Sequence, residues 1–364
     1  MSDQQFREQL AVWLSRENPE RGIREALSWA AVLCTDRGVT RTENQDRVAA
    51  IKLRSTSNAD RVLMAVAIAD GMGGMREGGN CASLTLANFF FALVHSSSSQ
   101  ALDSLARTAT LYANEAVFRF ARGAGGATLS AILIDHRGRT AFVNVGDSRI
   151  YSFSQQTEAK RLTVDDSLEE AVGGHGRELL QFIGMGAGLR PHTGHLDDAR
   201  NVALTSDGIH FLNQQTLSDI LNYAPDNRTA CERMAALARW SGGPDNASLA
   251  TVDVQRATRQ LTERDYAKIQ LWDPFGNVQF LDVRPNHAVP KLEQADLFSK
   301  RGSENSSFSS LDDQGPTTPS DGEAKRRKPS KRKQPRGERK KNIKVEVEVS
   351  RPAEGDDRDN EDSR

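Results

Sequence analysis

The chain is poor in cysteine. Among its 364 residues only three are cysteines, namely Cys34, Cys81 and Cys231, and they lie far apart with no C-x-x-C spacing. Their scarcity excludes a disulfide framework and a thiolate zinc site, and it is typical of a reducing compartment. We therefore expect Cys34 and Cys81 to be small apolar core residues.

Long hydrophobic runs are also missing. The longest apolar stretch, residues 84–94, still contains Thr85 and Asn88 and is too short to span a bilayer. The first residues, MSDQQFREQLAVWL, have no basic segment followed by a long apolar run, so no signal peptide is predicted. We expect a cytoplasmic protein with no membrane association.

The chain has no large net charge of either sign, because 48 Lys and Arg nearly balance 49 Asp and Glu. The balance conceals two opposed segments. Residues 325–344 carry a net charge of +11 and residues 345–364 one of −5, which leaves residues 1–324 at −7. A strongly basic nucleic-acid-binding core is therefore excluded, although a basic tail is present.

Residues 296–364 are predicted to form a disordered charged tail, because Ser, Asp, Pro, Lys and Arg dominate them and cannot bury enough apolar surface to offset ordering entropy. Within the tail, residues 343–349 alternate Ile or Val with Lys or Glu, a pattern able to add a strand to a partner's sheet. The basic run is either simply solvated or docks a protein partner or, less favoured, nucleic acid.

Hydrophobic periodicity divides the preceding residues into three parts. Residues 1–27 are predicted as an N-terminal helical extension, with a helix over 3–16. Residues 255–295 are predicted as an appended hairpin. Residues 28–254 form the main domain. Its predicted strands cover 29–34, 48–53, 62–69, 128–135, 140–145, 149–153, 202–205 and 247–254. Its predicted helices cover 80–95, 101–121, 216–222 and 229–240, and an irregular glycine-rich lid covers 155–200.

Four aspartates adjoin apolar strands. Asp70, Asp147 and Asp207 each follow one, and Asp245 shortly precedes one. Any one of them alone is more simply a turn residue. If the strand ends converge, however, the carboxylates repel one another unless they are protonated or share a cation. With no His or Cys cluster nearby, an all-oxygen site suits Mg²⁺ or Mn²⁺.

The segment 70–74, Asp-Gly-Met-Gly-Gly, supplies a further candidate ligand for the predicted metal site. Glycine after a ligand lets the backbone approach a bound ion closely, so the Gly71 carbonyl is a candidate ligand. The segment is not a phosphate-binding P-loop, because the pattern G-x-x-x-x-G-K-[ST] is absent.

Seven short motifs occur in a sensible order and spacing. They are RTENQD (41–46), ADGMGG (69–74), GAT (126–128), VGDSR (145–149), LTVD (162–165), TSDG (205–208) and DN (245–246). This series resembles the metal-dependent protein phosphatase 2C (PPM-type) family, in its bacterial branch, which has Met after the Asp-Gly where eukaryotic members usually have His. The resemblance covers about residues 28–254.

The resemblance implies an α+β fold, a four-layer α/β/β/α sandwich of two antiparallel sheets flanked by helix pairs. It also implies hydrolysis of phosphoserine and phosphothreonine in proteins. Two divalent ions, Mn²⁺ or Mg²⁺, bridged by a water would activate the reaction. The expected partner is a phosphoprotein substrate, with a serine/threonine kinase or its target as the default.

Carried over residue by residue, the resemblance makes Asp70 the bridge between both ions. Asp207 and Asp245 would complete one ion site, and the Gly71 carbonyl the other. Arg41 would hold the substrate phosphate, for which a guanidinium fork is well suited.

Asp46 would orient the metal-bound water, and the retention of Asp147 leaves room for a weak third ion. Several positions depart from the family pattern, namely Gln45, Met72, Asp166 and Phe211. None of them removes a ligand of the two-metal core. The alternative function is a catalytically weak or inactive phosphatase fold that acts as a phosphoprotein- or partner-binding regulatory module.

Overall fold

The computed structural model describes residues 2–17, 19–26, 30–54, 62–72, 77–96, 100–154, 157–173, 178–196, 199–261 and 269–280. The predicted tail over 296–364, with its strand-like segment 343–349, lies outside these residues and stays a prediction. None of the described helices is long and apolar enough to cross a membrane.

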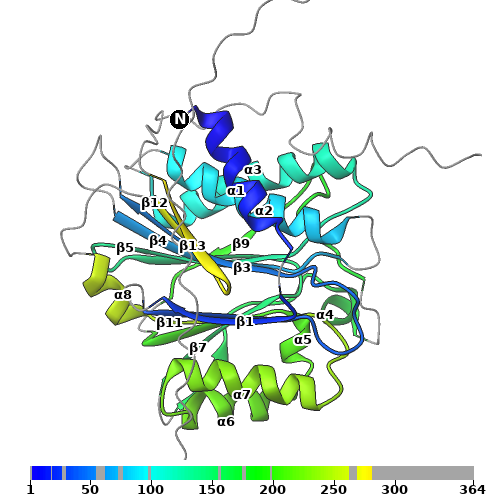
Figure 1. The fold of residues 1–364 in the computed structure, drawn as a ribbon, viewed down its shortest axis with the longest axis vertical. Helices are drawn as coiled ribbons and strands as arrows, with labels where there is room; N and C mark the ends of the chain where they lie inside the picture. Colours follow the sequence, from blue (N-terminus) through cyan, green and yellow to red (C-terminus); the bar gives the residue numbers. More distant parts are fainter. Residues whose placement is uncertain are drawn as a thin grey trace, which may run out of the picture.

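Two stacked β-sheets form the centre of the molecule (Figure 1). In spatial order, the six-stranded sheet contains β1 (Arg21–Ala26), β2 (Ala31–Asp36), β11 (Ala247–Asp253), β10 (Asn201–Thr205), β7 (Arg149–Ser154) and β8 (Thr157–Arg161). The seven-stranded sheet contains β13 (Gly276–Phe280), β12 (Ile269–Asp273), β3 (Arg47–Arg54), β4 (Val62–Ala69), β5 (Leu129–Asp135), β6 (Thr140–Val145) and β9 (His192–Gly194). All of these pairings are antiparallel.

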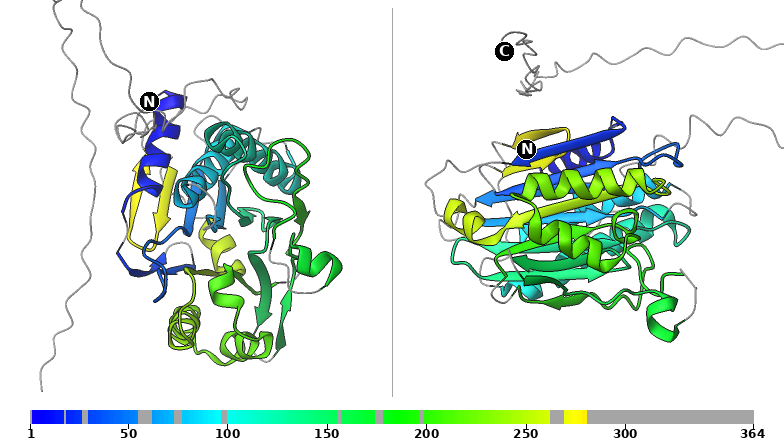
Figure 2. Two further views of the ribbon diagram at one scale, coloured as in Figure 1. Left: turned by 90° about the vertical axis from the view of Figure 1, so that its right-hand side faces the viewer. Right: turned by 90° about the horizontal axis from the view of Figure 1, so that it is seen from below.

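A pair of helices covers the outer face of each sheet (Figures 1 and 2). The seven-stranded sheet packs against α2 (Gly78–His95) and α3 (Leu102–Ala121), and α1 (Asp3–Leu14) packs beside α2. The six-stranded sheet packs against α6 (Gln214–Tyr223) and α7 (Asn227–Trp240). Three short helices complete the described chain, namely α4 (Leu168–Val172), α5 (Asp207–His210) and α8 (Val254–Leu261). The predicted four-layer α/β/β/α sandwich is confirmed.

Strand β4 shows how the sequence builds these layers. Successive side chains of a strand point to opposite faces, and every residue of β4 is buried. Leu63, Ala65, Ala67 and Ala69 face the core beneath α2 and α3. Val62, Met64, Val66 and Ile68 face the core between the two sheets. This central strand is apolar on both faces because helices cover one face and a sheet covers the other.

The structure differs from the predicted elements in a few places. Residues 21–26, expected to belong to a helical extension, form β1, which pairs along its whole length with β2. The lid is less irregular than expected, since it contains β8, α4 and β9. The predicted hairpin forms as β12 and β13, and β12 also pairs with β3. The domain boundaries remain predictions.

Candidate metal and phosphate site

The acidic residues expected from the sequence meet at one end of the sandwich. Asp46 immediately precedes β3 and Asp70 immediately follows β4, and these strands pair with Arg47 opposite Ala69. Asp207 begins α5 just after β10, and Asp245 lies just before β11, the strand paired with β10. A hydrogen bond joins the two sheets here, because the Ser206 hydroxyl donates to Asp46 Oδ2 at 2.8 Å.

Asp46 is the most enclosed of these carboxylates, with 2% of its surface exposed. Burial raises its pKa to about 7, the Ser206 hydrogen bond opposes this rise, and the charges of Asp207 and Asp245 add to it. Among the described residues, Asp46 Oδ1 has no hydrogen-bond partner. A buried carboxylate oxygen in that state requires a water molecule or an ion to satisfy it.

Asp70 lies at the electrostatic centre of the cluster. Burial raises its pKa well above the ordinary value, and the charges of Asp46, Asp207, Asp147 and Asp245 raise it further. These four carboxylates are therefore within electrostatic reach of Asp70, as the predicted convergence of strand ends requires.

Thr128 and Ser148 support this centre. The Asp70 amide donates to Thr128 Oγ1 at 2.9 Å, and the Thr128 amide donates to the Asp70 carbonyl at 2.8 Å. The Thr128 and Ser148 hydroxyls lie 2.7 Å apart in a hydrogen bond. Nearby, burial raises the pKa of Asp147 to about 7, and the charges of Asp207 and Asp165 contribute. Asp147 thus belongs to the same cluster.

Arg41 joins the cluster through an ion pair. Its Nη2 donates to Asp245 Oδ2 at 2.7 Å, while the Asn246 amide donates to Asp245 Oδ1 at 2.8 Å. The hydrogen bond to Asp245 raises the pKa of Arg41, as do the charges of Asp245, Asp207 and Asp70. The Arg41 side chain is 40% exposed, so it lies between the acidic cluster and solvent.

Two glycines of the predicted motifs allow close backbone contacts around the cluster. A Cβ at residue 71 would lie 2.3 Å from the Gly78 carbonyl oxygen, at the start of α2. A Cβ at residue 208 would lie 2.0 Å from the Asn246 carbonyl oxygen. Glycine is therefore required at both positions for the elements to meet.

Asn246 holds the loop that carries Arg41, a role that the sequence reasoning missed. Its Nδ2 donates to the carbonyls of Arg37 and Glu43 at 2.8 and 2.9 Å, and its Oδ1 accepts from the Gln45 amide at 2.8 Å. Asn44 adds an Asx turn, because its Oδ1 accepts from the Asp46 amide at 3.0 Å. The local pattern Asn-x-Asp is the signal that predicts this turn.

The position at which the family usually has His takes a different role here. Asp166 Oδ2 accepts from the Gly146 amide at 3.0 Å. Asp166 Oδ1 accepts from Gln181 Nε2 at 2.8 Å and lies 3.0 Å from His192 Nε2. Asp166 therefore ties the lid to the turn that precedes Asp147.

The cysteines take no part in the site. All three are free and buried, as predicted for Cys34 and Cys81, and burial raises the pKa of each of these two thiols to about 12. A thiol with such a pKa is protonated at neutral pH and is a poor nucleophile.

The donor chemistry of the cluster fits a divalent cation. No group of three His, Cys, Asp or Glu side chains within the described ranges is already close enough to enclose an ion, and Arg41 holds Asp245. The mutual repulsion that raises the pKa of Asp70 is, however, what a shared cation relieves. Carboxylate and carbonyl oxygens are the ligands that Mg²⁺ and Mn²⁺ prefer.

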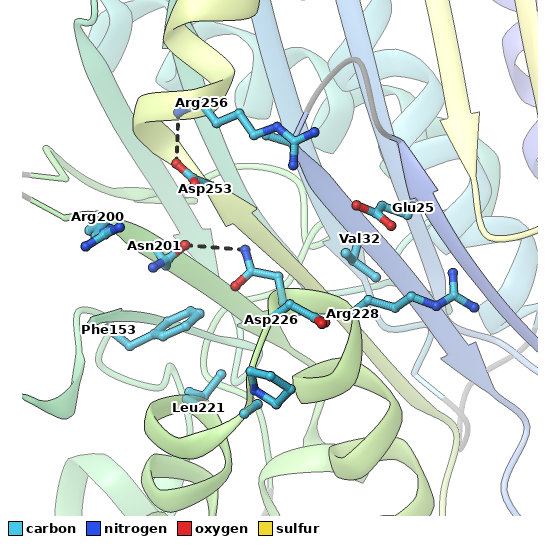
Figure 3. A pocket seen from close by; sticks show the side chains of 14 residues that line it. Glu25, Val32, Phe153, Arg200, Asn201, Leu221, Asp226, Arg228, Asp253 and Arg256 are labelled. Carbon is cyan, nitrogen blue, oxygen red and sulfur yellow. Dashed lines mark hydrogen bonds between the residues drawn. The ribbon is translucent and has the colours of Figure 1, made fainter. Parts of the chain in front are cut away.

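A cavity of about 370 Å³ lies at the opposite end of the six-stranded sheet, where β10 begins and β11 ends (Figure 3). Three arginines and three acidic residues line it, namely Arg200, Arg228, Arg256, Glu25, Asp226 and Asp253. These charges cancel, and none of the predicted site residues is among the residues that line the cavity.

Comparisons with known proteins agree with the motifs. The serine/threonine protein phosphatase PstP of Mycobacterium tuberculosis is 29% identical over 243 residues, an alignment that covers 60% of this chain and 44% of PstP. This chain therefore matches less than half the length of that relative. The crystal structure of the PstP catalytic domain in complex with two manganese ions superposes with a TM-score of 0.51 at 26% identity, covering 64% of this chain and 98% of that domain.

The chain is similar in sequence and fold to the PPM-type serine/threonine phosphatases of bacteria. A second PstP structure from M. tuberculosis gives a TM-score of 0.51 at 25% identity, covering 64% of this chain and 98% of that one. Staphylococcus aureus Stp1, at 20% identity and a TM-score of 0.53 over 65% of this chain and 98% of Stp1, shows the shared PPM-type fold alone. A scan against models of protein families gives no match.

Proposed function

We propose that this chain is a cytoplasmic serine/threonine protein phosphatase that depends on Mn²⁺ or Mg²⁺. The observation that carries the proposal is the convergence of five aspartates beside Arg41 at one end of the sandwich. They are Asp46, Asp70, Asp147, Asp207 and Asp245. The similarity to PstP supports the same activity class.

Asp70, Asp207, Asp245 and the Gly71 carbonyl would hold two ions, and Asp147 would contribute to a weak third site. When bound, such ions neutralise phosphoryl charge and lower the pKa of water. The buried carboxylates are the groups whose repulsion the ions would offset.

Arg41 and Asp46 would act on the substrate side of the site. The Arg41 guanidinium presents a planar set of donors that suits a phosphate dianion, and its exposure leaves it accessible to a protein-bound phosphate. Asp46, with a pKa of about 7 and an Oδ1 that has no partner among the described residues, is suited to orient a water molecule and to accept its proton near neutral pH. No covalent phospho-enzyme is needed.

The substrate is proposed to be a phosphoprotein, and a serine/threonine kinase or its target is the proposed partner. The described parts of the lid, residues 157–173, 178–196 and 199–200, adjoin the site through Asp166 and Ile183. The Asp166 amide donates to the Gly146 carbonyl at 3.0 Å, and the Ile183 amide to the Ala127 carbonyl at 2.8 Å. We propose that the lid sets the choice among phosphoproteins.

The test is phosphate release from phosphothreonine, phosphoserine and phosphotyrosine peptides by the purified full chain, in Mn²⁺, in Mg²⁺ and in EDTA. We expect hydrolysis of the first two peptides in metal and none in EDTA. Saturable peptide binding without phosphate release under every condition would instead establish the regulatory binding module, for which no observation now argues.

A further inference from the structure

Arg47, the residue after Asp46, connects three elements behind the site. Its Nε donates to the Leu14 carbonyl at the end of α1 at 2.7 Å and to Ser83 Oγ on α2 at 3.0 Å. Its Nη1 donates to the Asn44 carbonyl at 2.8 Å and to the Asp46 carbonyl at 2.7 Å. One side chain thus joins α1 and α2 to the backbone carbonyls of Asn44 and Asp46.

The partners of this arginine are unusual for a partly buried cation. All four acceptors are neutral, and no carboxylate of the described residues lies within ion-pair distance of Arg47 in the structure. Burial is the main cause that lowers the pKa of its guanidinium. Burying a charge without a charged partner is costly unless every donor is directed at an acceptor, so this arrangement is sensitive to the position of each acceptor.

Helix α1 supplies one of these acceptors and is itself seated on the rest of the fold. Its side chains Phe6, Leu10 and Leu14 are buried, and the Phe6 ring packs edge-on against Phe280 of β13, with centroids 4.9 Å apart. Beyond its end, Arg16 forms an ion pair with Asp273 of β12 at 2.6 Å. The position of the Leu14 carbonyl therefore depends on both α1 and the hairpin.

The two ends of Asp46 are fixed from opposite directions. Ser206, from the six-stranded sheet, donates to its carboxylate, and Arg47, reaching toward α1 and α2, donates to its carbonyl. A small cavity of about 10 Å³ lies beside Arg47, and Leu14, Asp46 and Asp273 are among the other residues that line it. The packing of α1 and the hairpin thus reaches the backbone of the proposed catalytic carboxylate.

We propose that Arg47 is the positioning residue for Asp46, and that its acceptors on α1 and α2 hold it in place for this role. The proposal rests on the proposed function in assigning Asp46 to catalysis. The competing explanation is that Arg47 only attaches α1 to the fold, in which case its loss lowers stability and leaves the site unchanged.

The test compares Arg47→Lys with Phe6→Leu. The first variant keeps the charge and loses the fork that reaches four acceptors, whereas the second weakens the packing of α1 without touching Arg47. Each is assayed in Mn²⁺ for kcat and KM on para-nitrophenyl phosphate, well below its melting temperature. We expect Arg47→Lys to lower kcat roughly tenfold with KM within about twofold, and Phe6→Leu to change kcat by less than about twofold.

A second measurement needs no activity. Hydrogen exchange of the Gln45 and Asp46 amides, which donate to Asn246 Oδ1 and Asn44 Oδ1, is followed in both variants, with the Ala65 amide in β4 as reference. We expect faster exchange at residues 45 and 46 in Arg47→Lys and, to a smaller extent, in a third variant, Ser83→Ala, but no change in Phe6→Leu. Equal exchange in Arg47→Lys and Phe6→Leu overturns the proposal. If the wild-type chain hydrolyses nothing, the proposed function fails, and the exchange comparison still decides whether Arg47 positions Asp46.

Discussion

At the scale of single residues, the main feature is the accumulation of negative charge in a buried site. Burial raises the pKa of Asp46 and of Asp147 to about 7, and it raises that of Asp70 well above its ordinary value. Each unit of such a shift corresponds to about 1.4 kcal/mol of disfavoured ionisation. The free-energy cost of ionising these carboxylates is therefore concentrated at the end of the sandwich where the phosphatase site is proposed.

Replacing the central carboxylate tests that feature. Asp70→Asn is expected to lower Mn²⁺-dependent hydrolysis on the order of a thousandfold, because it removes the bridging ligand of both proposed ions. In EDTA the variant should unfold at the same temperature as the wild type or higher, since a repelled charge is gone. Turnover assays and thermal unfolding measure both effects. Asp219→Asn, an exposed change on α6, is the control, and near-wild-type turnover by Asp70→Asn would contradict the assignment.

Arg41 makes a second prediction because it holds Asp245 in this structure. Arg41→Ala should raise KM for a phosphothreonine peptide roughly tenfold or more, through the loss of a charge-assisted contact to phosphate. Mn²⁺ should bind this variant more tightly than the wild type, because Asp245 no longer has to leave an ion pair. Calorimetric titration and steady-state kinetics give the two values. An unchanged KM would remove Arg41 from the phosphate site.

At the scale of elements, the site depends on how the loop between β2 and β3 is held. Asn246 makes three hydrogen bonds to the backbone of this loop, over residues 37–45. The loop carries Arg41 and leads into Asp46, so its attachment to Asn246 helps to position both residues.

Asn246→Asp tests the attachment with almost no change in shape. The variant keeps the oxygen that accepts from the Gln45 amide and loses the two donors to the loop carbonyls. Each lost bond is worth about 1 kcal/mol, and the new buried charge adds to this cost. We expect a fall of about 2–4 kcal/mol in the free energy of unfolding, measured by denaturant titration, together with lower kcat. Asn222→Asp on α6 is the comparison, and a loss no larger than in that control would show that Asn246 does not hold the loop.

Much of the fold follows from the sequence where apolar periodicity is strong. Strands 62–69 and 140–145 form with the predicted bounds. Strand β1, with the sequence RGIREA, has no clear apolar face and is defined by pairing with β2. Helix α5 has only four residues, which is too short for a periodic signal. The aspartates were found from their place beside strands, whereas the contacts of Arg47 and Asn246 depend on tertiary structure that no local pattern encodes.

At the scale of the whole molecule, the buried carboxylates couple stability to pH. In the unfolded chain Asp46 is ionised above about pH 4, whereas in the fold its pKa is about 7. Between these values the folded state binds the extra proton, so stability falls as pH rises.

Without metal, the free energy of unfolding should therefore decrease from pH 5 to pH 8, by about 2–3 kcal/mol for Asp46 alone. Thermal unfolding in EDTA across this range measures the trend. Added Mn²⁺ should raise the melting temperature most at pH 8, where the carboxylates are charged. A stability that rises steadily with pH in EDTA would show that these carboxylates are not buried together.

The tail supplies a prediction that separates chemistry from recruitment. Deleting residues 296–364 removes the segments of net charge +11 and −5. If the tail docks a protein partner, hydrolysis of para-nitrophenyl phosphate should stay within a few-fold of the full chain. Turnover of a phosphoprotein partner should fall, and the difference between the two chains should shrink above ~0.15 M salt. Loss of small-substrate activity would instead assign the tail to the active site.

The central claim is that one end of this sandwich is a hydrolytic site assembled by divalent cations. The most direct measurement is a Mn²⁺ titration of the EDTA-treated full chain, with bound metal and phosphate release from a phosphothreonine peptide recorded on the same samples. We expect two ions to bind per chain, activity to rise with their binding, and Asp70→Asn to lose both the binding and the activity. Hydrolysis that persists in EDTA, or a chain that binds no Mn²⁺, would contradict it.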